Sequence, residues 1–320
     1  MSRFKPTTTE CAEERSLEER LRRRIAVEQH FARTGHTYRH GPLQRNFERY
    51  VITPVLKHGL RLTGLYGRGF KNAVSPVVRN IQLYFPDLPS AFDGFEILHL
   101  SDLHIDGTRG LADVLARALR DLRPDVCLLT GDYRFEDRGP CEQVYPLMRS
   151  VVDNISAEHG VYGILGNHDS AQIALELEKM GVRMLINESA ELTKRGASIW
   201  LVGVDDPFDY QCDDLPGALR SVPAGAFKIL LAHAPELYRD ASHQGIHLYL
   251  CGHTHAGQIR MPFVGSLRHN AKCPRSYGHG AWRHKSMHGY TSAGVGCSTL
   301  PVRFNCPPEL VLIELRKHRS

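Results

Sequence analysis

The sequence lacks the long apolar run that a membrane-spanning helix needs, because nowhere do eighteen apolar residues follow one another. Its first residues, 1–6, also lack the apolar core of a signal peptide. Three arginines at 22–24 could begin a twin-arginine signal, but charged and polar residues at 28–30 stand where that signal needs an apolar stretch. We therefore expect a protein that is not exported and stays in the cytoplasm.

The sequence also lacks a C-x-x-C pair, although it contains eight cysteines. Two of them, Cys127 and Cys251, lie inside apolar runs that are typical of strands. Buried free thiols in a reducing compartment are the expected result, rather than disulfides or a thiolate metal site.

Internal repeats and low-complexity tracts are absent as well, so a globular domain is expected. With 320 residues and 42% apolar composition, the chain can form one large domain with an accessory segment. The net charge of +5 is uneven: residues 1–90 hold 16 Lys and Arg against 8 Asp and Glu, a net charge of +8. A basic front favours a polyanionic partner, either phospholipid head groups or nucleic acid.

The front of the chain contains two segments with helical character. Residues 13–33 are rich in charge and carry Leu17, Leu21 and Ile25 at helical spacing, which predicts a surface helix whose charged residues form a solvated face. No acidic residue occurs between Glu48 and Asp87. Within that stretch, apolar residues alternate with basic ones at Lys57, Arg61, Arg68, Lys71 and Arg79.

This pattern over residues 50–85 predicts a basic amphipathic segment that lies on the inner face of the cytoplasmic membrane. The alternative is a helical arm that packs on the main domain. We expect no nucleic acid partner, because no recognised nucleic-acid module is present. The sequence indicates no oligomeric state. The predicted division is a basic helical extension over 1–90 and a main domain over 91–320.

From residue 92 onwards, strand patterns alternate with helix patterns, which predicts parallel βαβ units. The expected strands are 95–100, 126–130, 161–165, 227–232 and 246–251, with helices at 111–122, 142–152 and 171–180. Two or three strands are expected over 184–204. The segment 258–313, rich in Gly and Pro, is expected to add antiparallel strands.

Five of these predicted strands end in residues that can bind a metal. Singly, each has an ordinary explanation, such as a helix cap, a turn residue or a core histidine. Their joint occurrence at one edge of a sheet favours a common site, where α/β sheets carry their chemistry. The set is Asp102, His104, Asp132, Asn167, His168, His233, His253 and His255.

Carboxylate, imidazole and amide donors without thiolate suit divalent Mn, Fe or Zn. Without His168, the set contains seven ligands, which are too many for one ion and sufficient for two. A carboxylate that bridges two ions would hold them about 3.5–4 Å apart, the spacing that generates a hydroxide and clamps a phosphoryl group.

The motif order D-x-H, G-D, G-N-H-D, H and G-H-T-H resembles the calcineurin-like metallophosphoesterases. Flanking runs such as 101–104 and 257–263 are similar to its bacterial YkuE/YaeI-like branch. The resemblance covers about 92–315 and implies a four-layer α/β/β/α sandwich with two mixed sheets face to face. Two departures are Ala256, where the branch often has Gly, and Tyr133, where an aliphatic residue or Phe is common.

The resemblance also implies how the ligands divide. One ion would be held by Asp102, His104, Asp132 and His255. The other would be held by Asp132, Asn167, His233 and His253. His168 would face the scissile phosphate and stabilise the transition state or protonate the leaving oxygen. Asp169 would orient His168 or cap the following helix.

The implied function is a two-metal hydrolase that cleaves a phosphoester or pyrophosphate bond with a metal-bridging hydroxide, on a phosphorylated small molecule or a lipid-linked substrate at the membrane face. The alternatives are a soluble protein or nucleotide phosphatase and a metal-binding scaffold without chemistry. Outside the motifs, we expect His284 and Arg303 to contact substrate. A solvated loop around His284 and an ion pair of Arg303 are the alternatives.

Overall fold

The computed structural model describes residues 16–35, 47–261, 265–266 and 270–318. The first of its two large sheets has the order β1-β14-β2-β3-β4-β5. Strands β2 to β5 run parallel, whereas β14 is antiparallel to β2 and parallel to β1. Their bounds are β1 Val77–Phe85, β14 Glu309–Lys317, β2 Phe95–Leu100, β3 Val126–Leu129, β4 Val161–Gly163 and β5 Val182–Met184.

Three helices link the parallel strands, as the sequence predicts: α5 (Leu111–Leu119), α6 (Val144–Val152) and α7 (Ala171–Lys179). Each is amphipathic. In α5, for example, Leu111, Leu115 and Leu119 recur at helical spacing and are buried. These side chains pack against Leu98 and Leu100 of β2 in one apolar cluster, so α5 to α7 form the layer outside the first sheet.

The second sheet has the order β12-β13-β9-β8-β7-β6. Its four inner strands β13, β9, β8 and β7 are parallel, and antiparallel pairs close both edges. The bounds are β6 Glu188–Lys194, β7 Ala197–Gly203, β8 Phe227–Leu231, β9 Leu248–Cys251, β12 Gly280–His284 and β13 Met287–Thr291. Two short helices, α8 (Leu215–Ala218) and α9 (Tyr238–His243), pack on its outer face.

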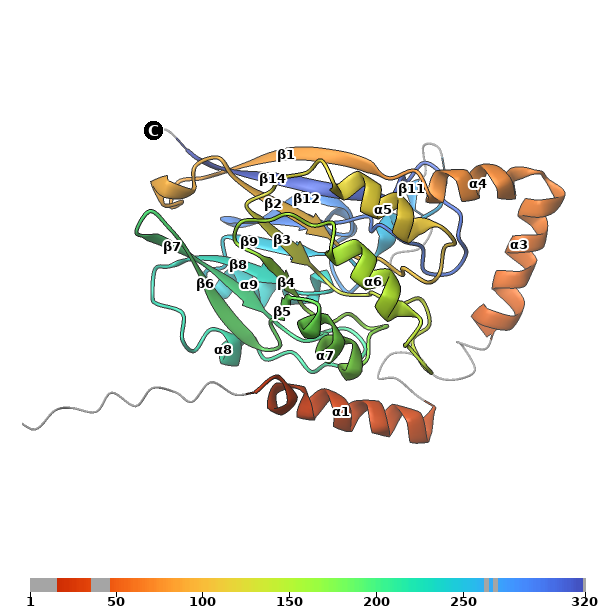
Figure 1. The fold of residues 1–320 in the computed structure, drawn as a ribbon, viewed down its shortest axis with the longest axis horizontal. Helices are drawn as coiled ribbons and strands as arrows, with labels where there is room; N and C mark the ends of the chain where they lie inside the picture. Colours follow the sequence, from red (N-terminus) through yellow and green to blue (C-terminus); the bar gives the residue numbers. More distant parts are fainter. Residues whose placement is uncertain (1–15, 36–46, 262–264, 267–269, 319–320) are drawn as a thin grey trace, which may run out of the picture.

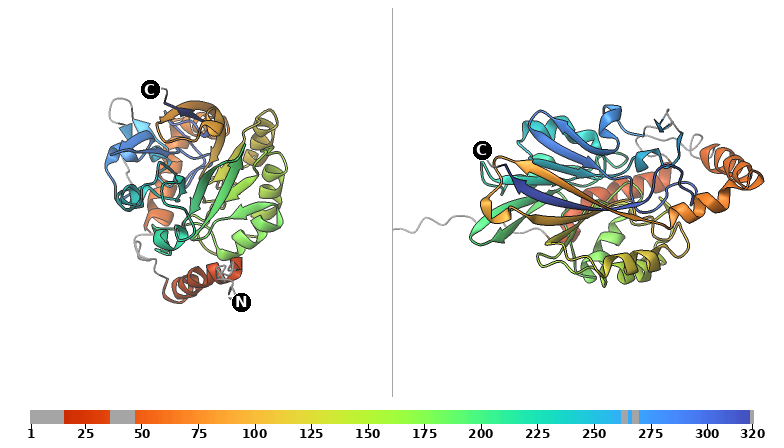
Figure 2. Two further views of the ribbon diagram at one scale, coloured as in Figure 1. Left: turned by 90° about the vertical axis from the view of Figure 1, so that its left-hand side faces the viewer. Right: turned by 90° about the horizontal axis from the view of Figure 1, so that it is seen from above.

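The alternation of side chains along the strands produces the layers. In β2, Phe95 and Ile97 point into the space between the two sheets, where they meet Ile229 and Leu231 of β8. The described residues thus form helix, sheet, sheet and helix layers, as two views of the ribbon show (Figure 1, Figure 2). This confirms the predicted four-layer mixed α/β sandwich.

Several short elements complete the described fold. A two-stranded ribbon pairs β10 with β11, and a π-helical turn precedes α3. Their bounds, with those of the 3₁₀ turns, are β10 Arg260–Met261, β11 Gly265–Ser266, η1 Glu48–Ile52, η2 Ser90–Phe92, η3 Pro235–Leu237, η4 His255–Gly257 and η5 Arg275–Tyr277.

The front of the chain contains α1 (Leu17–Thr34), α3 (Thr53–Leu62), α4 (Leu65–Ala73) and β1. The helical prediction for residues 50–85 is wrong for Val77–Phe85, which forms a strand along β14. β-Branched residues and period-two burial explain this, since Ile81, Leu83 and Phe85 turn inwards. The domain division at residue 90 stays a prediction, but residues before it contribute a strand to the first sheet.

Candidate metal centre

The predicted ligands lie on loops that leave the strands at one edge of the two sheets. Backbone hydrogen bonds tie these loops together: the Asp102 N–H donates to Gly131 O at 3.0 Å, the His104 N–H to Asp132 O at 2.9 Å, and the Gly252 N–H to His233 O at 2.9 Å. The first two bonds join the loop after β2 to the loop after β3. The last bond joins the loop after β8 to the loop after β9. Ligands from separate strands are therefore held in one frame.

The backbone at this edge adopts a conformation that L-residues rarely take. A positive φ in a non-glycine residue costs on the order of 1–3 kcal/mol and persists where the surrounding structure enforces it. Ala256 also has φ 50°, a backbone conformation that glycine adopts without strain. The ligands concerned are Asp102 (φ 51°), His104 (37°), Asp132 (58°), His253 (68°) and His255 (50°).

One donor group gathers around His104 and His255, whose Nε2 atoms are 3.1 Å apart. The Nε2 of His255 lies 3.3 Å from Oδ1 of Asp102. The Nε2 of His104 lies 3.5 Å from Oδ2 of Asp132. All four side chains are buried.

A second donor group gathers around the amide oxygen of Asn167. Its Oδ1 is 3.0 Å from Nε2 of His233 and 2.8 Å from Nδ1 of His253. Nε2 of His233 lies 3.3 Å from Oδ2 of Asp132. The same carboxylate oxygen of Asp132 therefore faces both groups, while its Oδ1 accepts the His168 N–H at 2.8 Å.

The donor spacing fits divalent ions. With metal–nitrogen bonds of about 2.1 Å, donors on one ion lie about 3.0–3.4 Å apart in octahedral or tetrahedral geometry. The observed separations are 2.8–3.5 Å. Nitrogen lone pairs that meet this closely repel one another unless a cation or a proton lies between them. The residues present therefore fit a metal centre.

Hydrogen bonds on the far side of two imidazoles fix which nitrogen faces the centre. Nδ1 of His104 is 2.7 Å from the carbonyl of Arg134, and Nδ1 of His233 is 2.7 Å from the carbonyl of Thr130. Because a carbonyl only accepts, Nδ1 carries the proton in each ring and Nε2 presents its lone pair. The Asn167 amide similarly donates to Asp209 at 3.4 Å, which leaves its oxygen for the centre.

The protonation states also suit a cation. Burial, together with the nearby His168, lowers the pKa of His104 to about 3. Burial likewise lowers the pKa of His253 and His255 well below the usual value, so these imidazoles are neutral, the form that binds metal. Burial alone would lower the pKa of His233, but Asp132 and Asp102 raise it to about 10. The field of these carboxylates thus favours positive charge at the centre.

His168 lies beside the first donor group, and one of its ring nitrogens is within 4.8 Å of donor atoms of His104 and Asp132. Its Nε2 is 4.0 Å from Oδ2 of Asp132, and 21% of its side chain is exposed. Nδ1 donates to the carbonyl of Phe135 at 2.6 Å, so Nε2 is directed towards the donors and solvent. A side chain in this position can meet a substrate that binds at the centre.

The expectation for Asp169 is wrong. Its carboxylate neither contacts the His168 ring nor caps α7. Instead it accepts the N–H groups of Asp132 at 2.7 Å, Tyr133 at 2.8 Å and Gly166 at 2.8 Å. Asp169 therefore locks the loop after β4 onto the loop after β3.

A comparison with protein families decides the identity of this arrangement. The model of the calcineurin-like phosphoesterase family matches residues 95–257, just over half of the chain. The chain belongs to the calcineurin-like phosphoesterase family. It is therefore a metal-dependent phosphoesterase by family, and the donor groups described above are its candidate metal-binding residues.

Individual relatives place the chain beside bacterial members of this family. YkuE of Bacillus subtilis, named a metallophosphoesterase, is 29% identical over 237 residues, which cover 72% of this chain and 82% of YkuE. The phosphodiesterase YaeI of Escherichia coli is 29% identical over 263 residues, covering 78% of this chain and 93% of YaeI. A Bos taurus transmembrane protein with a metallophosphoesterase domain is 31% identical, covering 60% of this chain and 47% of that protein. The predicted family and branch are thus confirmed.

The structure does not support the two predicted substrate contacts in this phosphoesterase. Arg303 is fully buried and donates to the carbonyls of Ala293 and Gly294 at 2.8 and 3.1 Å, near Nδ1 of His255 at 3.5 Å. It supports the backbone beneath the centre, because its guanidinium is already used by carbonyl groups. The alternative role considered for Arg303, an ion pair, is not the one that these hydrogen bonds show either.

His284 lies in an aromatic cluster on the outer side of the second sheet. Its Nδ1 is 3.1 Å from the hydroxyl of Tyr277, and its ring meets Tyr238 edge-on. None of its described contacts reaches the metal donors. Tyr133, the departure noted from the sequence, is fully buried, and its hydroxyl donates to Ile164 O at 2.9 Å, so it is a core residue.

Sequence reasoning missed the residues that support the ligands. Asp209 holds the Asn167 amide, and the side chain of Asn270 lies 3.3 Å from Nε2 of His253. Both lie in loops without a motif of their own. Asp205 and Asp206 are also buried, and Asp205 pairs with Arg24 of α1.

Proposed function

We propose that this chain is a two-metal phosphoesterase that hydrolyses a phosphodiester or pyrophosphate bond. The observation that supports two ions is the position of Asp132, whose Oδ2 lies 3.5 Å from Nε2 of His104 and 3.3 Å from Nε2 of His233. A carboxylate between two donor groups is the usual bridge of a two-metal site. The name phosphodiesterase given to YaeI favours diester substrates.

In this proposal, seven residues bind the metal ions and His168 acts on the substrate. Asp102, His104 and His255 would hold one ion, and Asn167, His233 and His253 the other, with Asp132 shared. Bound ions supply an activated water and neutralise charge on the phosphoryl group. Because Nδ1 of His168 donates to the Phe135 carbonyl, Nε2 faces the donor groups, and in the doubly protonated ring it would donate its proton to the leaving oxygen.

The test is hydrolysis of a chromogenic phosphodiester, a phosphomonoester and a nucleotide-diphosphate lipid by one preparation loaded with Mn²⁺, Zn²⁺ or Fe²⁺. We expect diester or pyrophosphate turnover that Asp132→Asn abolishes together with binding of both ions. His168→Ala should keep its metals while kcat falls by a factor on the order of 10²–10⁴.

Bound metal without turnover of any substrate would instead favour the non-catalytic scaffold. Preference for phosphomonoesters would favour the protein or nucleotide phosphatase. Loss of metal from His168→Ala would contradict the role assigned to that residue.

A second part of the proposal concerns where the enzyme acts: at the inner face of the cytoplasmic membrane, on a lipid-linked phosphoester or pyrophosphate. Among the described residues, no helix has both the length and the apolar character needed to cross a bilayer. However, within the described part of the chain, eight of the twelve exposed large apolar residues lie from Phe47 to Leu65, and Leu62 is 88% exposed. Helix α3 has no buried residue and stands away from the sandwich (Figure 1).

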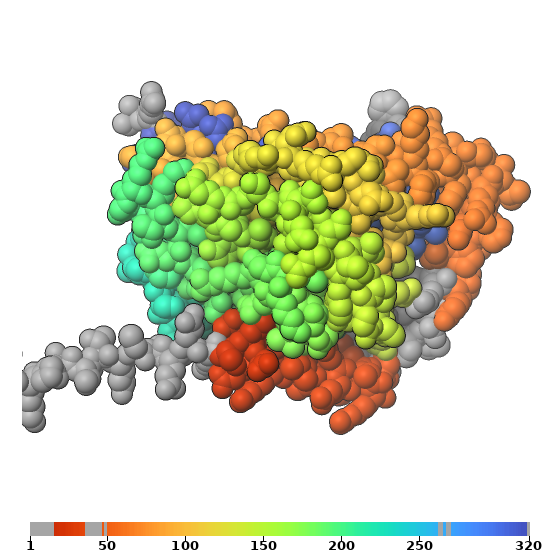
Figure 3. Space-filling model, viewed as in Figure 1, coloured from red at the N-terminus to blue at the C-terminus, as the bar shows by residue number. Residues whose placement is uncertain are grey.

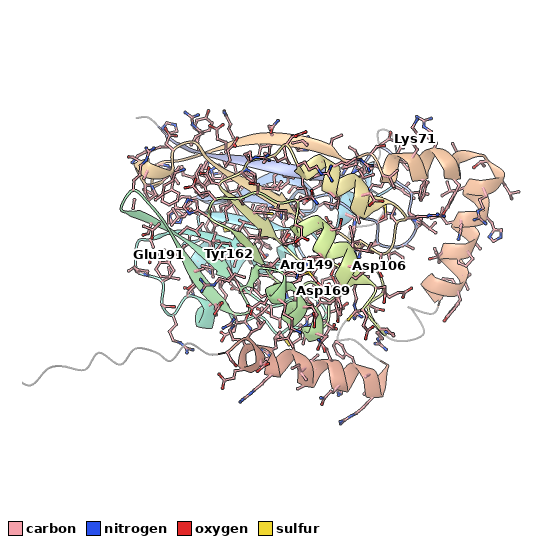
Figure 4. The ribbon with its side chains drawn as sticks, in the orientation of Figure 1. Lys71, Asp106, Arg149, Tyr162, Asp169 and Glu191 are labelled. Atoms are coloured by element: carbon pink, nitrogen blue, oxygen red, sulfur yellow. The ribbon has the colours of Figure 1, made fainter. Side chains whose placement is uncertain are left out.

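Basic side chains accompany this apolar surface, which we call the α3–α4 surface: residues 50–71 with Lys57, Arg61, Arg68 and Lys71. Figure 4 labels Lys71 on α4, at the opposite end of the view from Glu191. Apolar residues beside lysine and arginine are the composition of helices that lie on anionic lipid. Arg79 is not part of it, because its Nε pairs with Glu309 at 2.8 Å.

The α4 end of this segment is attached to the sandwich. The Asn72 amide donates to Arg303 O at 2.9 Å, and the Arg303 N–H donates to Gly69 O at 3.0 Å. These bonds support the predicted alternative, an arm that packs on the domain, for α4, which buries Gly69 and Ala73, whereas no residue of α3 is buried.

Sedimentation with vesicles tests the membrane proposal on the full chain. We expect binding to vesicles that contain phosphatidylglycerol, weaker binding to phosphatidylcholine alone, and release at high salt. Leu62→Ser should weaken binding without affecting hydrolysis of a soluble diester. Equal partitioning of the two proteins would contradict the membrane role, and a concentration-dependent dimer lost in Leu62→Ser would assign the surface to a second copy.

A further inference from the structure

Helix α1 lies outside the residues that match the family model, yet it packs tightly on the domain. Its N-terminus is closed by a capping box, in which Ser16 accepts the Glu19 N–H and the Glu19 side chain accepts the Ser16 N–H. Leu17 and Leu21 enter the same apolar cluster as α7. In the space-filling view, α1 (red) lies directly beneath α7 (green) (Figure 3).

Arg24 sits in the middle of this contact and is fully buried. Its Nη2 donates to Gly166 O at 2.6 Å and to Asp169 O at 2.7 Å. Its Nη1 pairs with the buried carboxylate of Asp205. The guanidinium stacks over the ring of Tyr210 at 3.9 Å.

The two carbonyls that Arg24 holds bracket a functional tetrapeptide. Between Gly166 and Asp169 lie Asn167 and His168. The amide oxygen of Asn167 is the atom that lies close to both His233 and His253. One nitrogen of Arg24 therefore fixes both ends of the loop that carries a metal ligand and the proton donor. Figure 4 shows Asp169 just above α1.

A second side chain of α1, Glu28, holds the next part of the loop. Its Oε1 accepts the Ala171 N–H at 2.7 Å, at the start of α7, where Ser170 makes no side-chain cap bond. Glu28 thus caps α7 from another helix. Residues 24 and 28 are one helical turn apart and lie on one face of α1. From that face they form hydrogen bonds with both ends of the segment 166–171.

Movement of this loop would reach the other ion site as well. The Asp169 carboxylate holds the N–H groups of Asp132 and Tyr133, and Asp132 in turn holds the His168 N–H. A side chain on Gly166 would collide with the Asp132 carboxylate. The loops after β3 and β4 therefore move as one unit.

We infer that Arg24 is a positioning residue of this enzyme: through it, α1 holds Asn167 and His168 in register with the ligands from the other strands. The inference rests on the proposed two-metal function of the site. A buried charge is an expensive way to attach a helix, since apolar residues of similar volume often serve stability as well. Its placement on the two carbonyls that flank Asn167 and His168 is what assigns it to the site.

The central experiment compares Arg24→Met with Arg22→Met in the full chain. Arg22 lies on the same helix with 77% of its side chain exposed, so its replacement controls for a change of charge on α1. We expect Arg24→Met to lower kcat for a soluble diester about 10- to 100-fold, because displacements near 1 Å at a reacting group have such effects. Arg22→Met should match the wild type.

Stability must be separated from positioning, since Arg24→Met leaves Asp205 buried without its partner. The double variant Arg24→Met/Asp205→Asn removes both charges. A double variant whose Tm returns towards the wild type while kcat stays low supports the positioning role. Recovery of both Tm and kcat would overturn it and leave Arg24 as a structural residue only.

A metal readout keeps this test independent of turnover. Mn²⁺ titration followed by electron paramagnetic resonance should show that Arg24→Met weakens the binding step that depends on Asn167 most, and the other step less, through Asp132. If the wild type binds Mn²⁺ but hydrolyses nothing, the proposed function fails while this titration still tests Arg24. Unchanged Mn²⁺ binding and unchanged kcat in Arg24→Met would overturn the inference.

Discussion

Helices α1 and α3 look alike in sequence and behave in opposite ways in the structure. Both are basic and both have an apolar stripe, but α1 buries Leu17, Leu21 and Phe31, whereas α3 buries no residue. The difference is that the buried face of α1 also carries Arg24 and Glu28. These two side chains form hydrogen bonds with backbone groups of the domain. A stripe alone does not determine whether a helix packs on its own chain; complementary polar groups on that stripe do.

The largest contrast should be seen in stability. Leu21→Ala removes a fully buried side chain and should lower the free energy of unfolding by about 2–5 kcal/mol. Leu62→Ala removes a side chain that is 88% exposed and should change it by less than about 0.5 kcal/mol. Urea unfolding followed by circular dichroism measures both. Equal losses would mean that α3 is packed in solution.

The second contrast concerns charge and lipid. Replacing Arg68 and Lys71 with alanine should reduce binding to anionic vesicles by about 2 kcal/mol, roughly thirtyfold, since each basic residue contributes about 1 kcal/mol near the surface. Replacing Arg22 and Arg33 on α1, which are also exposed, should leave vesicle binding unchanged. If both pairs reduce binding equally, attraction is a property of overall charge and the α3–α4 surface has no special role.

A smaller effect is expected at the start of α1. Ser16→Ala removes the side-chain half of the capping box and should destabilise the helix by about 1 kcal/mol. Hydrogen exchange of the first amides of α1 should accelerate about fivefold, while α3 and α4 exchange as before. Acceleration in α3 would show that the two segments are coupled, which the described contacts do not predict.

The smallest and most specific effect is linkage between metal and α1. If Arg24 couples the helix to Asn167, metal binding must stabilise the docked helix, because coupling between two sites is reciprocal. Adding Mn²⁺ should slow amide hydrogen exchange in α1 by a few fold. The exchange rates in α3 should not change. The effect should vanish in Arg24→Met. Equal exchange in the wild type with and without Mn²⁺ would contradict the coupling.

The positions of the parallel strands and the candidate metal donors could be proposed from the sequence because both depend on local patterns. Each donor follows an apolar strand, and parallel strands bring their ends to one edge. The supporting residues could not be predicted this way. Asp209 and Asn270 reach the donors through loops, and no periodicity tells which ligand a loop residue will meet.

The role of Arg24 was hidden for a different reason. It is one of three consecutive arginines, and charge runs on helices are usually solvated, so all three were expected on the surface. Helical spacing does separate them, since Arg24 follows Leu21 by three residues and precedes Phe31 by seven. Its burial depended on Asp205 and two carbonyls more than 140 residues away in sequence, which no local pattern contains.

The position of β14 between β1 and β2 has a consequence for how the chain is made. Strand β1 ends at Phe85, but its partner begins at Glu309, more than two hundred residues later. At synthesis rates of about 5–20 residues per second, β1 waits on the order of ten seconds or longer on the ribosome before that partner exists. The strands that carry the metal donors emerge during this interval. The first sheet can therefore be completed only after the donor loops have been synthesised, and α4 can be attached only after Arg303 has been added to the chain.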